Sequence, residues 1–488
     1  MVPVIKVHSI QCYMQMVDTR MPFRYGSAML IRCPHLYMVA TISDTQGRTA
    51  RGIAADNLPP RWFDKDPTKS FTQEVADQLQ VVKWASAAAQ AEAPTTPFRL
   101  WLSIYQAVQQ AAHTANLPPL LAGFGPSLVE RAVNDAVGHL TELPFHSLLR
   151  HNILGVELNL IDPALSNITP QQVLPDQPLQ AIAARHTVGL SDPIRTGDIA
   201  LDDRLYDGLP QSLEEVIAFY GVRYFKIKIQ NKLQEDIERL TAIATLLDSQ
   251  LPATPYFCTL DGNEQYEALE QLLPVMEALT THPVLKRLAS SLLFIEQPLA
   301  RSVALDPARC AGIERITQQF PVIIDESDDA LDAYRRALEI GYSGTSHKNC
   351  KNAFKSVANL ARSRRIQEQT GQPRLMSAED LTNIGIVALQ EDLTALSSLG
   401  ITHAERNGHH YFRGLSHLSP EDQQRARRAT PDLYSQGEDY VRLNITEGDI
   451  SCHSLHQTVG LGVAAWPQLE NFMAIEDFDI GQELQSPC

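Results

Sequence analysis

The sequence has few features of a secreted, membrane-bound or nucleic-acid-binding protein. Its seven cysteines are an odd number, are scattered and include no Cys-x-x-Cys pair, which is typical of a reducing compartment and not of a disulfide framework. Acidic residues outnumber basic ones by 57 to 41, which argues against nucleic acid or an anionic membrane as the main partner. No apolar run approaches the length of a membrane span, and residues 1–8 lack a secretory apolar region. We therefore expect a cytoplasmic protein with no nucleic-acid or membrane partner.

The 488 residues are enough for two domains, and the content of 44% hydrophobic and 20% charged residues is ordinary for a globular protein. Residues 1–60 alternate as antiparallel strands do, with a turn at 44–47 and a polar, arginine-containing loop at 18–28. Residues 70–150 have the spacing of helices. Strands followed by helices predict a separate α+β domain over residues 1–150.

The sequence pattern over residues 151–449 predicts a second domain. Residues 154–177 are rich in Pro, Asn and Gln, and we interpret them as an inserted loop. Eight strand-like runs then alternate with helical stretches, which predicts a parallel (β/α)8-type TIM barrel in the α/β class. In that fold, charged residues at the C-terminal ends of strands form the active site. The eight runs are residues 186–190, 224–229, 256–260, 292–295, 322–324, 344–347, 374–377 and 401–404.

Five of these runs carry or end in charged residues that a buried strand should not contain. These residues are Lys226 and Lys228, Asp261, Glu296, Asp325 and Lys348. Lys226 and Lys228 are two positions apart, so they share one face of their strand. Three carboxylates at one barrel mouth would repel one another, so we expect a cation among them. Hard oxygen ligands favour Mg²⁺, with Mn²⁺ as the alternative.

Lysines beside such a cation and partly removed from water would have lowered pKa values, which would make them usable as bases. With a metal between lysines, a lysine would remove a proton next to a carboxylate, and the metal and its neighbouring cations would stabilise the resulting ene-diolate. The pattern therefore predicts an enzyme that acts on a small-molecule carboxylate.

Each of these residues also has an ordinary structural interpretation. A single aspartate at a strand end is more often a helix cap or a turn residue than a metal ligand. Strand lysines often lie along a sheet edge with their charge in water. Three carboxylates on consecutive strands, flanked by lysines on strands without an exposed edge, favour the metal site instead. Glu326 competes with Asp325 for the place of third ligand.

The order and spacing of five motifs resemble the enolase superfamily, and within it the muconate-lactonizing-enzyme-like branch of the mandelate racemase/muconate lactonizing enzyme family. The motifs are Lys-x-Lys at 226–228, Asp-x-Asn at 261–263, Ile-Glu-Gln-Pro at 295–298, Asp-Glu-Ser at 325–327 and Lys348. The resemblance covers about residues 1–410. It implies a modified enolase barrel, an α+β cap whose first loop closes over the substrate, and a homo-oligomer.

The resemblance also implies a role for each motif residue. The implied Mg²⁺ ligands are Asp261, Glu296 and Asp325. Lys228 would be the base on one face of the substrate, and Lys348 its counterpart on the other. Lys226 would be the electrostatic partner of the substrate carboxylate. Asn263 would orient the metal ligands from behind, and Glu326 would face outward or pair with a lysine.

Substrate contacts are expected from the first loop, the seventh strand and the loop after the eighth strand. The candidates are Arg20, Arg24, Tyr25, Glu379, Asp380, His409 and His410. The alternatives are a solvated surface loop for the first three, helix caps for the two carboxylates and polar surface for the histidines. Lys351 and Lys355 are expected to be solvated helix residues, and His347 to be structural.

Two departures from the resembling family narrow the interpretation. The seventh strand lacks the histidine of the His-Asp pair used by the mandelate racemase branch, and the eighth lacks the Asp-x-Asp of dipeptide epimerases. We expect a Mg²⁺-dependent lyase or isomerase, which would be a racemase, epimerase, cycloisomerase or syn-dehydratase. The alternatives are an acid-sugar dehydratase acting by β-elimination and a non-catalytic binding or assembly relative. Part of the tail at 450–488, around 460–466, is expected to pack on the cap.

Overall fold

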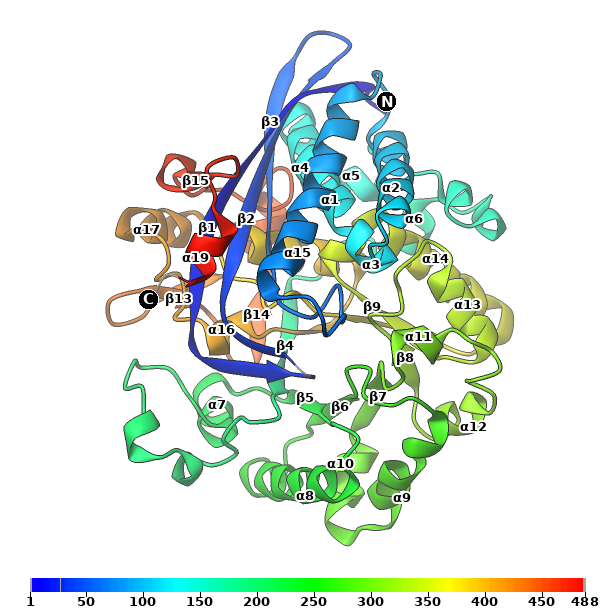
Figure 1. Ribbon diagram of the computed structural model, residues 1–488, viewed down its shortest axis with the longest axis vertical. Coiled ribbons are helices and arrows are strands. Elements are labelled where there is room, and N and C mark those ends of the chain that lie inside the picture. Colours follow the sequence, from blue (N-terminus) through cyan, green and yellow to red (C-terminus); the bar gives the residue numbers. More distant parts are fainter. Residues whose placement is uncertain (1, 27, 486–488) are drawn as a thin grey trace.

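The computed structural model describes residues 2–26 and 28–485 and has two parts, an antiparallel sheet with its helices and a parallel barrel (Figure 1). The sheet contains β1 (Ile5–Tyr25), β2 (Ala28–Asp44) and β3 (Thr49–Asn57), with the short β15 (Met473–Ala474) beside β1. The expected turn at 44–47 joins β2 to β3. Gly47 has a φ of 78° there, a left-handed conformation that glycine adopts without a steric penalty.

The predicted polar loop at 18–28 is wrong, apart from Ser27, which lies outside the described residues. β1 and β2 continue through this segment and form the end of a long hairpin. Its side chains Val17, Phe23 and Leu30 are buried in a small core of their own. Burial of one face keeps the segment extended although its other face is polar.

Helices cover the sheet and extend the cap. They are α1 (Phe71–Ala91), α2 (Pro97–Thr114), α3 (Pro119–Ala122), α4 (Phe124–Thr141) and α5 (Phe145–Arg150). Ser70 and Gln73 form a capping box that fixes the start of α1. Helix α4 packs directly on β3 because Gly52 has no side chain: a Cβ there would lie 2.2 Å from the carbonyl oxygen of Ala132.

The barrel has eight parallel strands, and the predicted (β/α)8-type barrel with an α+β cap is confirmed. The strands are β4 (Ala181–Val188), β5 (Tyr224–Lys228), β6 (Phe257–Asp261), β7 (Leu292–Glu296), β8 (Val322–Ile324), β9 (Gly344–His347), β10 (Leu375–Ala378) and β11 (His403–Glu405). Their order is β10-β9-β8-β7-β6-β5-β4-β11. The barrel is nearly closed, since the described residues show no ladder between β10 and β11.

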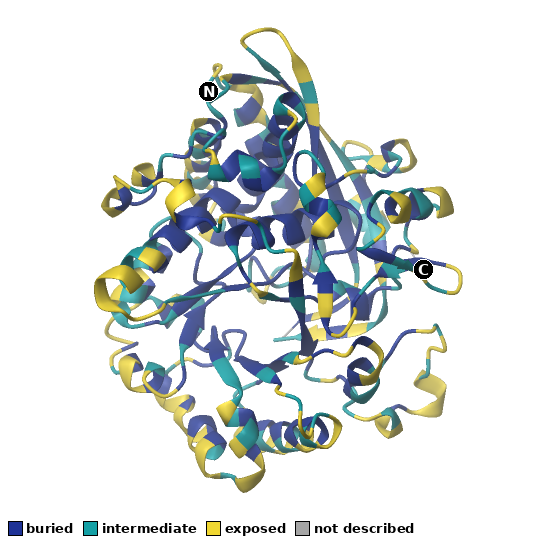
Figure 2. Ribbon diagram, turned by 180° about the vertical axis from the view of Figure 1, so that it is seen from behind, coloured by how far each residue is buried: buried dark blue, intermediate teal, exposed yellow. Residues whose placement is uncertain are grey.

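Helices between the strands surround the barrel, and the outer faces of many of them are exposed (Figure 2). They include α7 (Leu213–Tyr220), α8 (Leu233–Gln250), α9 (Leu273–Thr281), α10 (Lys286–Ser290), α11 (Arg301–Ala304), α12 (Ile313–Thr317), α13 (Ala333–Ile340), α14 (Ala353–Thr370) and α15 (Val387–Leu399). Every residue of α15 is buried, because this helix lies between the barrel and β3 of the cap.

The insertion at 154–177 holds only short helices, among them α6 (Pro170–Val173). The tail contains α16 (Gly408–Tyr411), α17 (Pro420–Ala429), β12 (Tyr434–Gln436), β13 (Val441–Leu443), β14 (Asp449–Ser451), α18 (His453–Gln457), β15 and α19 (Ile480–Gln485). Strand β14 pairs with β4 of the barrel, and β15 pairs with β1 of the cap. Between them, Gly460 exchanges backbone hydrogen bonds with Leu143 and Phe145. The tail therefore contacts both parts of the molecule.

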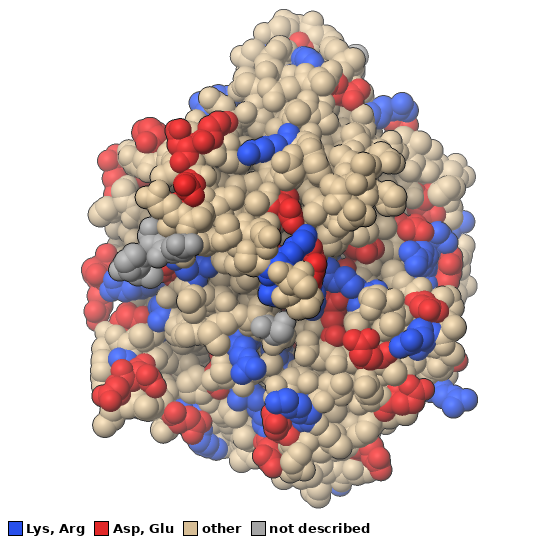
Figure 3. Space-filling view, viewed as in Figure 1, with Lys and Arg blue, Asp and Glu red and all other residues tan. Residues whose placement is uncertain are grey.

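The surface carries charges of both signs. On the face shown in Figure 3, Lys and Arg side chains alternate with Asp and Glu and do not gather in one basic area. Among the described helices, none combines the length and apolar character that a membrane crossing requires.

Candidate active site

Lys226 lies at the centre of four carboxylates inside the barrel mouth. Its Nζ is 2.6 Å from Glu405 Oε2, 2.9 Å from both Asp261 Oδ2 and Glu296 Oε2, and 3.0 Å from Glu379 Oε2. Burial by itself would lower the pKa of Lys226, but the four negative charges outweigh it and raise that pKa well above its usual value. The expected lowering of the lysine pKa concerns lysines beside a bound cation, so it stays a prediction for Lys226.

Lys228, two positions along β5, pairs among the described residues with Asp261. Its Nζ lies 2.6 Å from Asp261 Oδ2, while Asp261 Oδ1 accepts a hydrogen bond of 2.8 Å from the backbone of Asn263. Burial opposes ionisation of Asp261, but Lys226 and Lys228 prevail and lower its pKa to about 2. Asp261 is thus an ionised carboxylate with lysine partners.

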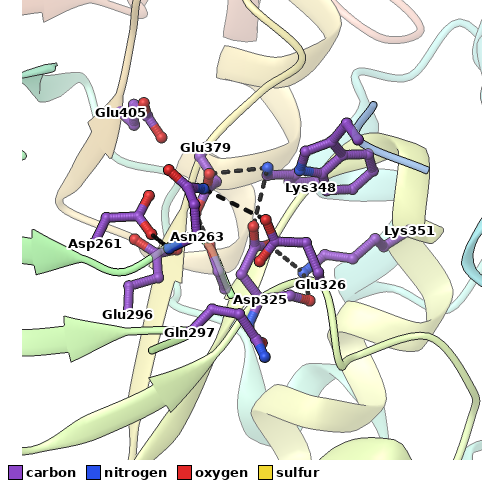
Figure 4. Close-up of polar contacts among 12 residues, drawn as sticks. Asp261, Asn263, Glu296, Gln297, Asp325, Glu326, Lys348, Lys351, Glu379 and Glu405 are labelled. Carbon is purple, nitrogen blue, oxygen red and sulfur yellow. Dashed lines mark hydrogen bonds and ion pairs between the residues drawn. The ribbon is translucent and has the colours of Figure 1, made fainter. Parts of the chain in front are cut away.

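A group of three buried carboxylates could hold a metal ion. One oxygen from each of Glu296, Asp325 and Glu379 lies within 4.8 Å of the others (Figure 4). Among the described residues, no donor is aligned to hydrogen-bond either oxygen of Glu296, although Lys226 Nζ is close. Burial, followed by the charge of Glu379, raises the pKa of Glu296 well above its usual value. Oxygen-only ligands with an unsatisfied member fit Mg²⁺.

This group differs from the predicted ligand set by one member. The predicted residues Glu296 and Asp325 belong to it, and Glu379, which was predicted to contact substrate, takes the place of Asp261. Glu379 also accepts a hydrogen bond of 2.9 Å from Ser346 Oγ. The position of Glu379 at the end of β10 follows the same rule that located the other carboxylates, so the sequence carried the signal.

Lys348, at the end of β9, connects this group to the cap. Its Nζ is 3.1 Å from Asp325 Oδ2 and 2.9 Å from Glu379 Oε2. The indole ring of Trp62, from the loop between β3 and α1, lies with its centre 4.1 Å from the same Nζ. Burial disfavours the charge of Lys348, but the carboxylates Asp325 and Glu379 raise its pKa well above the usual value. The expected lowering of the pKa beside a bound cation stays a prediction for Lys348 too.

The expectation that Lys351 and Lys355 are solvated is also wrong. Lys351 Nζ is 2.9 Å from Asp325 Oδ1, and Lys355 Nζ is 3.0 Å from Asp328 Oδ1. Both lysines are buried because the turn after Lys348 and the start of α14 fold against the end of β8. Sequence reasoning missed Lys351, which ends the short 3-10 turn Asn349–Lys351 that directly follows Lys348.

The two residues expected behind the ligands lie beside each other. Asn263 Nδ2 is 3.4 Å from Glu326 Oε1. Burial, then the nearby charge of Asp325, raises the pKa of Glu326 to about 7. Glu326 therefore faces inward and is not turned out to solvent.

A pocket opens between the barrel mouth and the cap. Of the predicted residues, Lys228, Lys348, Asn263, Tyr25, Glu379 and Asp380 line it. Sequence reasoning missed Phe23, Pro59, Trp62, Leu381, Thr382, Glu405 and Asn407, which also line it. Lys226 is fully buried and is not among the described lining residues.

Four predicted substrate contacts lie outside the described lining of this pocket. Arg20 makes a two-point ion pair with Asp207, and Arg24 is exposed. His409 and His410 are buried and pack around His186, with ring centres 5.6 Å and 4.7 Å from it. Burial lowers the pKa of His409 to about 3, so this imidazole is neutral.

Comparison with known proteins identifies the fold. No protein-family model and no curated protein matches the sequence. A mandelate racemase/muconate lactonizing protein from Herpetosiphon aurantiacus superposes with a TM-score of 0.57 at 15% identity, over 96% of this chain and 100% of that chain. The fold is that of the enolase superfamily.

Two further solved structures have this fold at similar distance. A dipeptide epimerase from Enterococcus faecalis, complexed with Mg and a dipeptide, has 15% identity and a TM-score of 0.56, with 94% of this chain and 99% of that chain covered. An N-succinyl Arg/Lys racemase from Bacillus cereus has 15% identity and a TM-score of 0.56, with 93% and 98% covered. At these identities the enolase-superfamily fold is established, and the muconate-lactonizing branch is not distinguished from the others.

Proposed function

We propose that the protein is a metal-dependent lyase or isomerase that removes the proton α to the carboxylate of a small-molecule substrate. The observation that carries this proposal is one pocket lined by both Lys228 and Lys348, beside a group of three carboxylates that fits a cation. The racemase and epimerases among the structural neighbours support the same reaction class.

The charge balance of the site supports a divalent cation. Six buried carboxylates face four buried lysines, which leaves two formal negative charges when every group is ionised. The carboxylates are Asp261, Glu296, Asp325, Glu326, Glu379 and Glu405, and the lysines are Lys226, Lys228, Lys348 and Lys351. Uncompensated buried charge is costly, so one Mg²⁺ would neutralise the site.

Glu296 and Asp325, with Glu379 or Asp261, would hold this ion. When bound, Mg²⁺ would supply positive charge beside the substrate carboxylate. Lys228 and Lys348 would each remove or return a proton at the α-carbon, since both reach the same pocket. Lys226 contacts four carboxylates and not the pocket, so we assign it the role of orienting those carboxylates.

Lysines on two sides of one pocket suit racemisation, epimerisation, cycloisomerisation and syn-dehydration. The test is exchange of the substrate α-proton for deuterium in D₂O, with pooled carboxylic acids and with or without Mg²⁺. We expect exchange that requires both the metal and an intact Lys228. Exchange that continues in metal-stripped protein, or no exchange in a broad pool at any Mg²⁺ or Mn²⁺ concentration, would contradict the proposal.

A further inference from the structure

The cap contributes an aromatic wall to the pocket. Phe23 and Tyr25 come from the β1–β2 hairpin, and Pro59 and Trp62 come from the loop after β3. The Tyr25 hydroxyl donates a hydrogen bond of 2.7 Å to the Pro60 carbonyl, so Tyr25 offers its ring to the pocket and not its hydroxyl. A substrate group that meets this wall is therefore surrounded mainly by apolar atoms.

No unpaired cation meets this wall among the described lining residues. The lysines of the pocket, Lys228 and Lys348, both belong to the barrel side. Lys348 Nζ lies 4.1 Å from the centre of the Trp62 ring, but its charge is already paired with Asp325 and Glu379. Arg20, on the same hairpin as Phe23, is tied to Asp207, and Arg24 is exposed. A second carboxylate on the substrate would lose its water without gaining a positive partner, which disfavours dicarboxylates.

Two carboxylates that line the pocket near Leu381 are already paired, whereas Asn407 Oδ1 and Asn263 Oδ1 have no hydrogen-bond partner among the described residues. Asp380 Oδ2 accepts from Arg406, and Asp380 Oδ1 accepts from the backbone of Thr382 at 2.8 Å. Glu405 accepts from Lys226 at 2.6 Å and from Asn407 at 2.7 Å. A polyhydroxylated chain would compete with these bonds for the carboxylate oxygens, and the two asparagine oxygens could accept from only part of its hydroxyls, which disfavours sugar acids.

From this lining we infer the substrate class: an acid with a single carboxylate and an apolar substituent about the size of a phenyl ring. The carboxylate would lie on the barrel side, and the substituent would lie against Phe23, Tyr25 and Trp62. This inference rests on the proposed function for the position of the carboxylate.

Four 2-hydroxy acids test the inference because they differ only in the substituent. Mandelate carries a phenyl ring, lactate a methyl group, malate a second carboxylate and gluconate a polyhydroxy chain. We expect Mg²⁺-loaded protein to bind mandelate more tightly than the other three by calorimetry, and to exchange its α-proton faster in D₂O. Burial of a phenyl-sized group predicts a preference of roughly 10- to 100-fold.

Variants of the wall separate its contribution from folding. Trp62→Ala and Phe23→Ala should bring the mandelate-to-lactate ratio of affinities toward one, and the milder Phe23→Leu should retain part of it. Phe219→Ala is the matched control, because Phe219 is an exposed aromatic residue outside the pocket lining. A ratio that stays unchanged in folded Trp62→Ala and folded Phe23→Ala would overturn the inference.

The outcomes test the inferred substrate class and the proposed reaction separately. Tighter binding of malate or gluconate than of mandelate, or equal binding of all four, would overturn the apolar class and leave proton abstraction untouched. Preferred binding of mandelate that depends on Trp62, without exchange of any of the four α-protons under any metal condition, would support the apolar class and count against the reaction.

Discussion

The two sides of the pocket are built by opposite means. The barrel side consists of buried charges at strand ends, each fixed by ion pairs of about 3 Å or less, such as those of Lys228 and Lys348. The cap side consists of apolar rings on a hairpin and a loop, such as Phe23 and Trp62. Strand ends in one sheet have fixed spacing, so they suit chemistry that needs accurate geometry, whereas loops can vary to select a substrate.

The cap side is nevertheless fastened to the barrel. Arg301 donates to the carbonyls of Trp62 and Phe63 at 2.8 Å and 2.9 Å, and it pairs with Glu264 at 2.7 Å. Glu264 also pairs with Lys65, from the same loop as Trp62. These contacts fix the position of the loop that carries Trp62 above Lys348. They therefore connect the cap side of the pocket to the barrel side.

Loss of a lysine on the barrel side should have the largest effect. Lys228→Gln and Lys348→Gln should each slow α-proton exchange by roughly 10²- to 10⁴-fold, because each removes a proton-transfer group. Lys232→Gln is the control, since this lysine is 59% exposed and lies four residues after Lys228. Exchange rates measured by NMR give the result. A full rate in either pocket variant would remove that lysine from the mechanism.

Substitution of the metal ligands should have the second-largest effect, and it should identify the third ligand. Mg²⁺ at a hundredfold excess over its dissociation constant should add about 2.7 kcal/mol to the stability of metal-stripped protein, and Glu296→Gln should abolish the gain. Comparing Glu379→Gln with Asp261→Asn by thermal unfolding then shows which carboxylate completes the site. Glu339→Gln, an exposed carboxylate, is the control.

No upward shift of the unfolding temperature in the unaltered protein, with either Mg²⁺ or Mn²⁺, would mean that the carboxylates bind no metal. A shift that survives in Glu296→Gln would place the ion elsewhere. Either result would contradict the assignment of the buried carboxylates on the barrel side as the metal site.

Loss of the contacts between the cap loop and the barrel should have the smallest effect, and this effect should be on substrate affinity. Arg301→Met removes the hydrogen bonds to the loop of Trp62, and we expect KM to rise about tenfold, on the order of 1.4 kcal/mol, with kcat nearly unchanged. Arg287→Met is the control, because Arg287 pairs with Asp248 outside the pocket lining. A fall in kcat without a change in KM would instead place Arg301 in the chemistry of the barrel side.

The sequence predicted the barrel side better than the cap side. Runs of apolar residues ending in Asp261, Glu296 and Asp325 located the strands and their charges, because a charge at the end of a buried strand stands out locally. Glu379 follows a strand in the same way, but a helix cap explained it equally well. Phe23 and Trp62 carried no signal, since an aromatic residue in an extended segment is normally part of a core.

Sequence by itself determined the order of elements, the eight strands and the strand ends where charges gather, since each depends on periodicity within a few residues. Only the tertiary structure decided which charges meet. Four carboxylates contact Lys226 because strands far apart in the chain converge in the barrel, and the hairpin and loop of the cap place Phe23 and Trp62 over the lysines. Those distances depend on packing between distant segments, which no local pattern records.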